Sequence, residues 1–328
     1  MPEVPFLQQG IAFLAIQAEH GPMAAPSLHS TSIRYFLEVA GSGSVQLAAS
    51  RLFVAPSAVS RQIAKLEDML GASLFERQPR GMALTAAGQR LAAHLRHAVL
   101  DAEHVIDQVR QLGRETSARV RLCCTEGFAA DFMPAFMQDY WHAQPGSRVE
   151  LQVGDPGSVT QWLLRGEADI GLKYAVAPEP GLQVEHSSRA PVLAVMATGH
   201  PLASQDRVAL AEVVKYPLLV GSAGVTARQL FDLACNAQGL RYHAEFVSNF
   251  SSVMLPLLRS PQILLSGPLS VAHRVRAGAV VARPFAGATV LHQRRLQVLS
   301  LEGRTLPTPL RACLDALRGA IENAGALP

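Results

Sequence analysis

The chain has 328 residues, of which 49% are hydrophobic and 17% are charged. This length predicts two domains or three, and the composition argues against intrinsic disorder. A net charge of +3 is too small to indicate a nucleic-acid-binding protein by itself. No apolar run reaches the length of a membrane span. The four cysteines form no CxxC pair, which is typical of free thiols in a reducing cytoplasm, so we expect a cytoplasmic protein.

The first 27 residues show neither helical nor strand periodicity, and four of them are prolines. We therefore expect residues 1–27 to form a poorly ordered extension. Met1 and Met23 both remain candidate start sites, because the structured pattern begins only after Met23.

Three short helices are predicted next. The first begins at Thr31 or Ser32 and is broken by the glycines and serines of 41–44; the second covers Val45–Leu52, and the third Pro56–Leu70. Pro56 suits the first turn of a helix, where its missing N–H costs nothing. Two short helices joined by a turn of a few residues are typical of a helix-turn-helix.

The third helix carries side chains that suit a DNA groove. Ser57 and Ser60 are small hydroxyls near its N-terminus, and Arg61 and Lys65 add positive charge on the same face. A solvated surface helix is the alternative interpretation. The next segment favours DNA, because residues 74–85 predict a strand, a basic turn and a second strand, a wing that presents Arg77 and Arg80.

Residues 34–91 resemble the winged helix-turn-helix of LysR-type transcriptional regulators. The matching motifs, in order, are Ala48-Ala49-x-x-Leu52, Ser57-Ala58-Val59-Ser60-Arg61-Gln62-Ile63, Leu66-Glu67, Leu70-Gly71, Leu74-Phe75-x-Arg77 and Leu84-Thr85-x-Ala87-Gly88. The chain departs from the family pattern at Pro56-Ser57, which removes one possible base-contacting amide, and at Ala86. The resemblance implies DNA contacts from Pro56, Ser57, Ala58, Ser60, Arg61, Lys65, Arg77 and Arg80.

A long helix is expected after Thr85, its N-cap, and before Gly113. Apolar residues recur along it at spacings of 4 and 3, as in a coiled-coil seam: Leu91, Leu95, Ala98, Ala102, Val105, Val109 and Leu112. A second copy of the chain is the economical partner for this seam, and the resemblance implies a dimerising linker helix. His94, His97, Asp101 and His104 follow one face of the helix, but a solvated flank explains them better than a metal site does.

From Arg119 onward, strands alternate with short helices, which predicts a largely parallel sheet with helices on both faces. The resemblance implies a two-lobed effector-binding domain like a periplasmic solute-binding protein. Loops after strands line the ligand crevice of such folds. They supply the residues that we expect to bind a small, anionic or polar organic molecule: Thr125, Gly127, Ser158, Ser222, Thr226, Ser248, Asn249, Ser251 and Ser266.

Two further charged features are open to more than one interpretation. Lys173 follows a predicted strand and would add a cation to the crevice, unless it is an ordinary surface lysine. No acidic residue lies between Glu245 and Glu302, whereas six arginines do, namely Arg259, Arg274, Arg276, Arg283, Arg294 and Arg295. This asymmetry fits an anion-attracting face, a dimer contact or plain solubility.

Two other functions were weighed. A secreted solute-binding module would need a signal peptide, and the helix-turn-helix counts against it. An enzyme is disfavoured because the chain has no GxGxxG, P-loop, HExxH or GxSxG pattern. Cys123 and Cys124 sit next to each other in a strand, where burial as small hydrophobes explains them better than nucleophilic catalysis.

The sequence thus predicts an N-terminal all-α winged helix-turn-helix with a long linker helix and a two-lobed C-terminal α/β domain. The expected boundaries are 28–86 for the DNA-binding domain, 87–117 for the linker and 118–328 for the effector domain. Within the last, the first lobe covers about 118–188 and 291–328, and the second about 189–290. Expected partners are duplex DNA, a small effector and further copies of the chain as homodimer or homotetramer, with RNA polymerase a further candidate; no membrane, metal, cofactor or catalytic role is expected.

Overall fold

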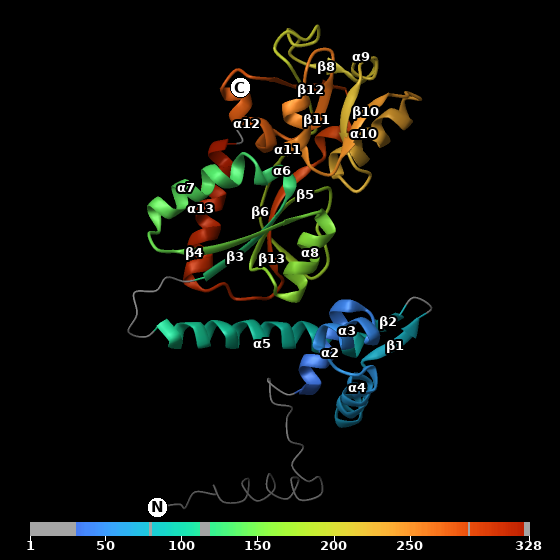
Figure 1. Ribbon diagram of the computed structural model, residues 1–328, viewed down its shortest axis with the longest axis vertical. Helices are drawn as coiled ribbons and strands as arrows, with labels where there is room; N and C mark the ends of the chain where they lie inside the picture. Colours follow the sequence, from blue (N-terminus) through green and yellow to red (C-terminus); the bar gives the residue numbers. More distant parts are fainter. Residues whose placement is uncertain (1–30, 79–80, 112–118, 288, 325–328) are drawn as a thin grey trace, which may run out of the picture. The chain divides into compact units, whose positions relative to one another are not determined.

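The computed structural model describes residues 31–78, 81–111, 119–287 and 289–324 (Figure 1), without the side chains of 97, 101, 103, 104, 107–111 and 289. The predictions for residues 1–27, Arg80 and Leu112 lie outside this range, as does the side chain of Val109. The chain divides into two compact units, Met1–Ala102 and Glu103–Pro328.

Three helices form the core of the first unit: α2 (Thr31–Ser42), α3 (Val45–Leu52) and α4 (Pro56–Leu70). Ser44 caps α3, its hydroxyl accepting a hydrogen bond from the Leu47 amide at 3.3 Å. One apolar side of each helix is buried, including Phe36 of α2, Ala48 of α3 and Leu66 of α4. The spacing of these residues therefore fixes which face of each helix turns inward.

An antiparallel wing follows, made of β1 (Phe75–Gln78) and β2 (Gly81–Leu84). The wing is tied to the turn between α2 and α3, because the Met82 amide donates to the Gly43 carbonyl at 2.8 Å. Gly81 has a φ of +133°, and a Cβ there would lie 2.4 Å from the same carbonyl oxygen, so only glycine fits. Helix α5 (Ala86–Gln111) begins directly after Thr85, whose hydroxyl accepts a hydrogen bond from the Gly88 amide at 3.1 Å.

A five-stranded sheet in the order β4-β3-β5-β13-β6 forms what we call the first lobe, residues 119–189 and 295–324. Helices α7 and α13 cover one face and α8 covers the other (Figure 1). Its elements are β3 (Arg119–Thr125), α6 (Glu126–Ala129), α7 (Phe132–Ala143), β4 (Arg148–Gly154), α8 (Pro156–Arg165), β5 (Ile170–Ala175), β6 (Leu182–Arg189), β13 (Arg295–Leu301) and α13 (Thr308–Ala324).

A six-stranded sheet in the order β10-β9-β11-β7-β12-β8 forms the second lobe, residues 193–286. Helix α10 packs on one face, and α11 and α12 pack on the other. Its elements are β7 (Leu193–Met196), β8 (Val208–Ala209), α9 (Leu210–Val213), β9 (Leu218–Gly221), α10 (Thr226–Ala237), β10 (Ala244–Ser248), α11 (Ser251–Met254), the 3-10 turn η1 (Leu255–Leu257), β11 (Ile263–Ser266), α12 (Pro268–Arg276) and β12 (Val281–Ala286).

Both sheets are largely parallel, as expected, but each contains one strand that runs against the others. Strand β7 runs antiparallel to both its neighbours, β11 and β12, and β13 runs antiparallel to β5 and β6. These two strands enter their sheets just after the chain has crossed from one lobe to the other, at residues 190–192 and, after the 3-10 turn η2 (Thr289–His292), at 293–294. Two strands that follow each other in one sheet need a long crossover, usually a helix, to run parallel. A strand that arrives from the other lobe has no such crossover before it, so it is able to run antiparallel to its neighbours.

Candidate functional site

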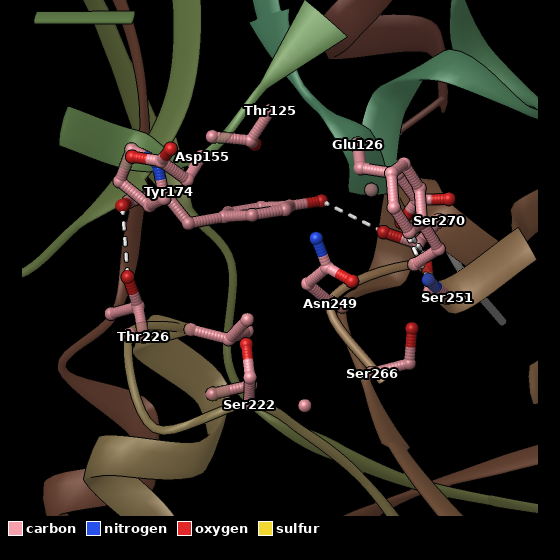
Figure 2. A pocket seen from close by; sticks show the side chains of 18 of the residues that line it. Thr125, Glu126, Asp155, Tyr174, Ser222, Thr226, Asn249, Ser251, Ser266 and Ser270 are labelled. Atoms are coloured by element: carbon pink, nitrogen blue, oxygen red, sulfur yellow. Dashed lines mark hydrogen bonds between the residues drawn. The ribbon is translucent and has the colours of Figure 1, made fainter. Parts of the chain in front are cut away.

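A cavity of about 290 Å³ lies between the two lobes of the second unit. From the first lobe it takes residues at the ends of β3 and β4 together with Tyr174 of β5; from the second it takes the loops that follow β9, β10 and β11. Figure 2 shows the Tyr174 ring crossing this space, with polar side chains of both lobes around it. Strand ends and loops of two sheets thus meet at one concave site, the usual position of a small-molecule site in α/β proteins.

Eight of the nine sequence-predicted effector residues line this cavity: Thr125, Gly127, Ser222, Thr226, Ser248, Asn249, Ser251 and Ser266. The ninth, Ser158, does not line it; its hydroxyl donates instead to the carboxylate of Asp155 at 2.7 Å, inside the first turn of α8. Ser158 therefore helps to stabilise the start of its own helix through Asp155, the N-cap residue of α8.

Lys173 does not serve the cavity either. It belongs to β5, is only 1% exposed, and pairs with the carboxylate of Glu179 while bonding to the Thr160 hydroxyl. Both interpretations from the sequence, a crevice cation and a surface lysine, are thereby corrected. A buried ammonium requires a carboxylate partner, and Glu179 fills this role.

The arginine that does reach the cavity is Arg294, which the sequence analysis named only as one of six arginines that fit an anion-attracting face, a dimer contact or plain solubility. Arg294 is 2% exposed; its Nε donates to the Ala190 carbonyl at 2.8 Å, and its Nη2 donates to the Pro191 carbonyl at 3.0 Å. Its guanidinium stacks on the Tyr174 ring, 4.2 Å from the ring centre. Among the described side chains no carboxylate pairs with it. The only sequence signal was its place in the arginine-rich stretch before β13.

Burial lowers the pKa of Arg294 to about 10, although the neighbouring Tyr174 acts in the opposite direction. A shift of this size means that the charged form loses about 3 kcal/mol relative to water. The cavity wall thus holds a cation whose described partners are carbonyl oxygens and the Tyr174 ring, and an anion in the cavity would supply the missing countercharge.

Two further cavity residues are polar and shielded. The Thr125 hydroxyl is buried, with the residue 8% exposed, and it has no hydrogen-bond partner among the described residues, so a donor or acceptor group of a ligand would satisfy it. Glu126 begins α6 in the first lobe, and its carboxylate accepts hydrogen bonds from Ser251 and Ser252 of the second lobe. Apolar contacts come from Val225, Met254 and Leu265.

The buried cysteines behave as predicted from the sequence. Cys123 and Cys124 point to opposite faces of β3 and join two different cores. Burial raises the pKa of both thiols, that of Cys124 to about 12. They are packing residues and not nucleophiles.

A second candidate surface lies on the helix-turn-helix unit. Pro56, Ser60 and Arg77, three of the predicted DNA contacts, line one open groove of about 580 Å³ between α4 and the wing. Ser57, Arg61 and Lys65 are exposed along α4, and Ala58 is half-buried. The sequence analysis missed Ser44 and Gln46 at the start of α3 and Gln78 of the wing, which line the same groove.

The residues of the predicted linker seam differ in burial: the first ones pack on the helix-turn-helix unit, whereas Val105, further along α5, is exposed. Leu95 is buried in the core of the helix-turn-helix unit, so its assignment to a dimer seam is corrected, whereas Leu91 packs against that core and is half-buried. Ala98 and Ala102 are half-buried, and Val105 is exposed beside the exposed Ile106. Heptad spacing alone did not reveal that the first turns of α5 already have a partner in their own unit.

No group of three or more potential metal ligands occurs among the described residues. Of the four polar residues that the sequence analysis noted along α5, the side chains of His97, Asp101 and His104 are not among those described. None of the helices in the described part of the chain has the length and apolar content to cross a membrane.

A winged helix-turn-helix joined to an α/β domain with a cavity between its lobes is the architecture of a ligand-responsive transcriptional regulator. Residues 30–89 match the model of the bacterial regulatory helix-turn-helix proteins of the lysR family, and residues 113–322 match the LysR substrate binding domain. The chain belongs to the LysR family of transcriptional regulators. Both models describe regulators and not enzymes.

Individual relatives are distant. The HTH-type transcriptional regulator SsuR of Burkholderia cenocepacia is 28% identical over 58% of this chain, and the chain spans 63% of that protein. The SDS degradation transcriptional activation protein of a Pseudomonas species is 29% identical over 88% of this chain and 94% of its own length. Full-length OxyR from Pseudomonas aeruginosa shares the fold, with a TM-score of 0.59 and 18% identity, over 90% of this chain and 95% of its own.

Proposed function

We propose that the protein binds duplex DNA sequence-specifically through its helix-turn-helix unit and that a small organic anion in the inter-lobe cavity controls this binding. The observation that carries the effector half of the proposal is Arg294, a buried cation on the cavity wall without a carboxylate partner among the described residues. The DNA half is supported by the groove that Pro56, Ser60 and Arg77 share.

In the DNA complex, α4 enters the major groove with its N-terminal turn facing the bases. Ser57, Ser60 and Arg61 contact base edges or nearby phosphates, and Lys65 contacts the backbone further along. The wing contributes Arg77 and Arg80 to phosphates or to the minor groove. Pro56 and Ala58 complete the set by allowing close approach of the helix end.

In the effector complex, the anionic group pairs with Arg294 and the polar lining fixes orientation. Thr125, Ser222, Thr226, Ser248, Asn249, Ser251 and Ser266 supply hydroxyl or amide groups, Gly127 leaves room, and Met254 and Leu265 contact the apolar part. The effector shifts the population between lobe arrangements, and the oligomer transmits the shift to DNA.

We further propose a homodimer or homotetramer that associates through the exposed later part of α5, where Val105 and Ile106 lie. RNA polymerase is a candidate partner at the promoter. A regulator of this class works on chromosomal DNA, so the proposal places it in the cytoplasm. The boundaries that we propose for its domains remain 28–86, 87–117 and 118–328.

Two measurements test the proposal. Fluorescence anisotropy with the DNA beside the protein's own gene should show binding that weakens steeply as salt increases; no binding at low salt would contradict the DNA half. A thermal-shift screen of small carboxylic acids, each compared with its carboxamide, should find acids that raise the melting temperature of the full chain while their amides do not. Equal shifts of the melting temperature by an acid and its carboxamide would contradict the proposal that the effector is an anion.

A further inference from the structure

The Glu126 carboxylate joins the two lobes across the cavity wall. Its Oε2 accepts hydrogen bonds from the amide and the hydroxyl of Ser251, both at 2.6 Å, and its Oε1 accepts one from the Ser252 amide at 2.9 Å. Glu126 belongs to α6 of the first lobe and both serines to α11 of the second, and the Glu126 residue is only 9% exposed. In Figure 2 Glu126 and Ser251 face each other beside Ser270.

Among the described residues around the cavity, these are the shortest hydrogen bonds that join an element of the first lobe to an element of the second. The Thr226 hydroxyl meets the Tyr174 carbonyl at 3.2 Å, and the hydroxyls of Tyr174 and Ser270 lie 3.5 Å apart. Both of those contacts cross between the lobes but join neutral groups. Hydrogen bonds to an ionised, water-shielded carboxylate are shorter and about twice as strong.

We infer that Glu126 is a positioning residue that holds the two lobes closed over the cavity when no effector is bound. Separating α6 from α11 would expose the carboxylate to water but would leave the start of α11 without its capping acceptor, so closure is favoured. Opening this bridge widens the way into the cavity for a ligand. Glu126 therefore sets the rate of exchange at the cavity, a consequence that rests on the function proposed above, whereas the closure itself needs no ligand.

Two substitutions remove the bridge in different ways. Glu126→Gln removes the charge at nearly constant volume. Ser251→Pro leaves Glu126 in place but deletes both of the donors that Ser251 supplies. Proline fits this position, because Ser251 is the first residue of α11 and the preceding Phe250 has φ −116° and ψ 108°, the extended conformation that a residue before proline requires.

Asp155 provides a matched control. It is a second carboxylate on the same cavity wall, but its hydrogen bonds go to Ser158 within the first lobe. Asp155→Asn therefore changes the charge of the cavity by the same amount as Glu126→Gln without touching a contact between the lobes.

The readout is accessibility of the closed cavity in the full chain without any effector. Ser266 is buried on the cavity wall, so Ser266→Cys places a thiol there. The four natural cysteines are buried and burial raises their pKa, so they react slowly with a maleimide. Added to Ser266→Cys, both Glu126→Gln and Ser251→Pro should increase the labelling rate of the cavity thiol about tenfold or more, as expected for loss of a charge-assisted hydrogen bond. Asp155→Asn should leave the rate unchanged.

The outcomes separate this inference from the proposed function. Unchanged labelling in the bridge variants, or an equal increase with Asp155→Asn, overturns the role of Glu126 but leaves an anionic effector in place. An increase confined to the bridge variants supports it even if no carboxylic acid shifts the melting temperature. Far-UV circular dichroism identifies a variant that does not fold, in which case the other bridge variant decides.

Discussion

The guanidinium of Arg294 lies 4.2 Å from the centre of the Tyr174 ring and joins parts of both lobes. Tyr174 belongs to β5 of the first lobe, whereas Nη2 of Arg294 also contacts the Ser266 carbonyl of the second, at 3.4 Å. Arg294 itself lies in the crossing segment, where its carbonyl accepts from the Ala190 amide at 3.0 Å. A ligand that pairs with this arginine acts directly on the chain segments that connect the lobes.

Arg294→Gln should abolish the thermal shift caused by carboxylic acids, because the countercharge for the ligand is gone. Arg294→Lys should retain part of the shift, since it keeps a positive charge but loses the planar stacking on Tyr174. The measurement is the melting temperature of each full-length variant with and without acid. A full response in Arg294→Gln would show that the anion binds elsewhere.

Arg77→Ala should weaken DNA binding for specific and unrelated sequences alike, because a phosphate contact carries no base information. The slope of log affinity against log salt should decrease by about 1. Anisotropy titrations at several salt concentrations measure this slope. Lys215→Ala is the control, since this exposed lysine pairs with Glu212 in the effector domain; an unchanged slope for Arg77→Ala would remove the wing from the interface.

Phe53→Asn should stabilise the helix-turn-helix unit by about 1 kcal/mol. Phe53 closes α3 with φ 55°, a left-handed conformation that asparagine tolerates better than phenylalanine, and its residue is 94% exposed, so little packing is lost. Amide exchange of buried residues in α4 should slow about fivefold. Phe53→Ala keeps the strain and should exchange like the parent; equal slowing in both variants would mean that the φ angle is not the cause.

Asp169→Asn should destabilise the first lobe by about 3 kcal/mol, because it removes the carboxylate between Arg121 and the buried Arg304. Burial raises the pKa of Asp169, but the hydrogen bonds and charges of the two arginines outweigh burial and hold it below its usual value. A lowered carboxyl pKa stabilises the fold above pH about 4 and ceases to do so as pH falls through the folded-state value.

The difference between the parent and Asp169→Asn should therefore shrink on acidification below pH about 4. Urea unfolding followed by tryptophan fluorescence measures it, since both tryptophans of the chain, Trp141 in α7 and Trp162 in α8, lie in this lobe. A constant difference across pH would contradict the assigned role of the carboxylate.

Local signals made much of this fold predictable. The bounds expected for α3 and α4 agree with the structure, because Pro56 and apolar spacing act within one helix. The strands β6 and β12 were not predicted, since half-buried residues in mixed sheets leave little alternation to detect.

The polar partners of the cavity were harder to predict for a different reason. Glu126 and Ser251 are 125 residues apart in sequence, and Arg294 contacts Ala190 across 104 residues, so no local pattern links them. Hydroxyl-rich loops after strands were visible one at a time, whereas the buried charges became visible only once both lobes were assembled. The predictions for Lys173 and Leu95 were wrong for the same reason, because the residues that contact them come from elsewhere in the fold.

The position of β13 has a consequence for how the molecule is made. This strand lies between β5 and β6 and pairs with both, so these two strands lack their shared neighbour until nearly the whole chain has left the ribosome. All strands of the second sheet are synthesised earlier, so that lobe is able to fold while its neighbour waits. Biogenesis thus runs against chain order within this domain: the lobe that begins first is completed last.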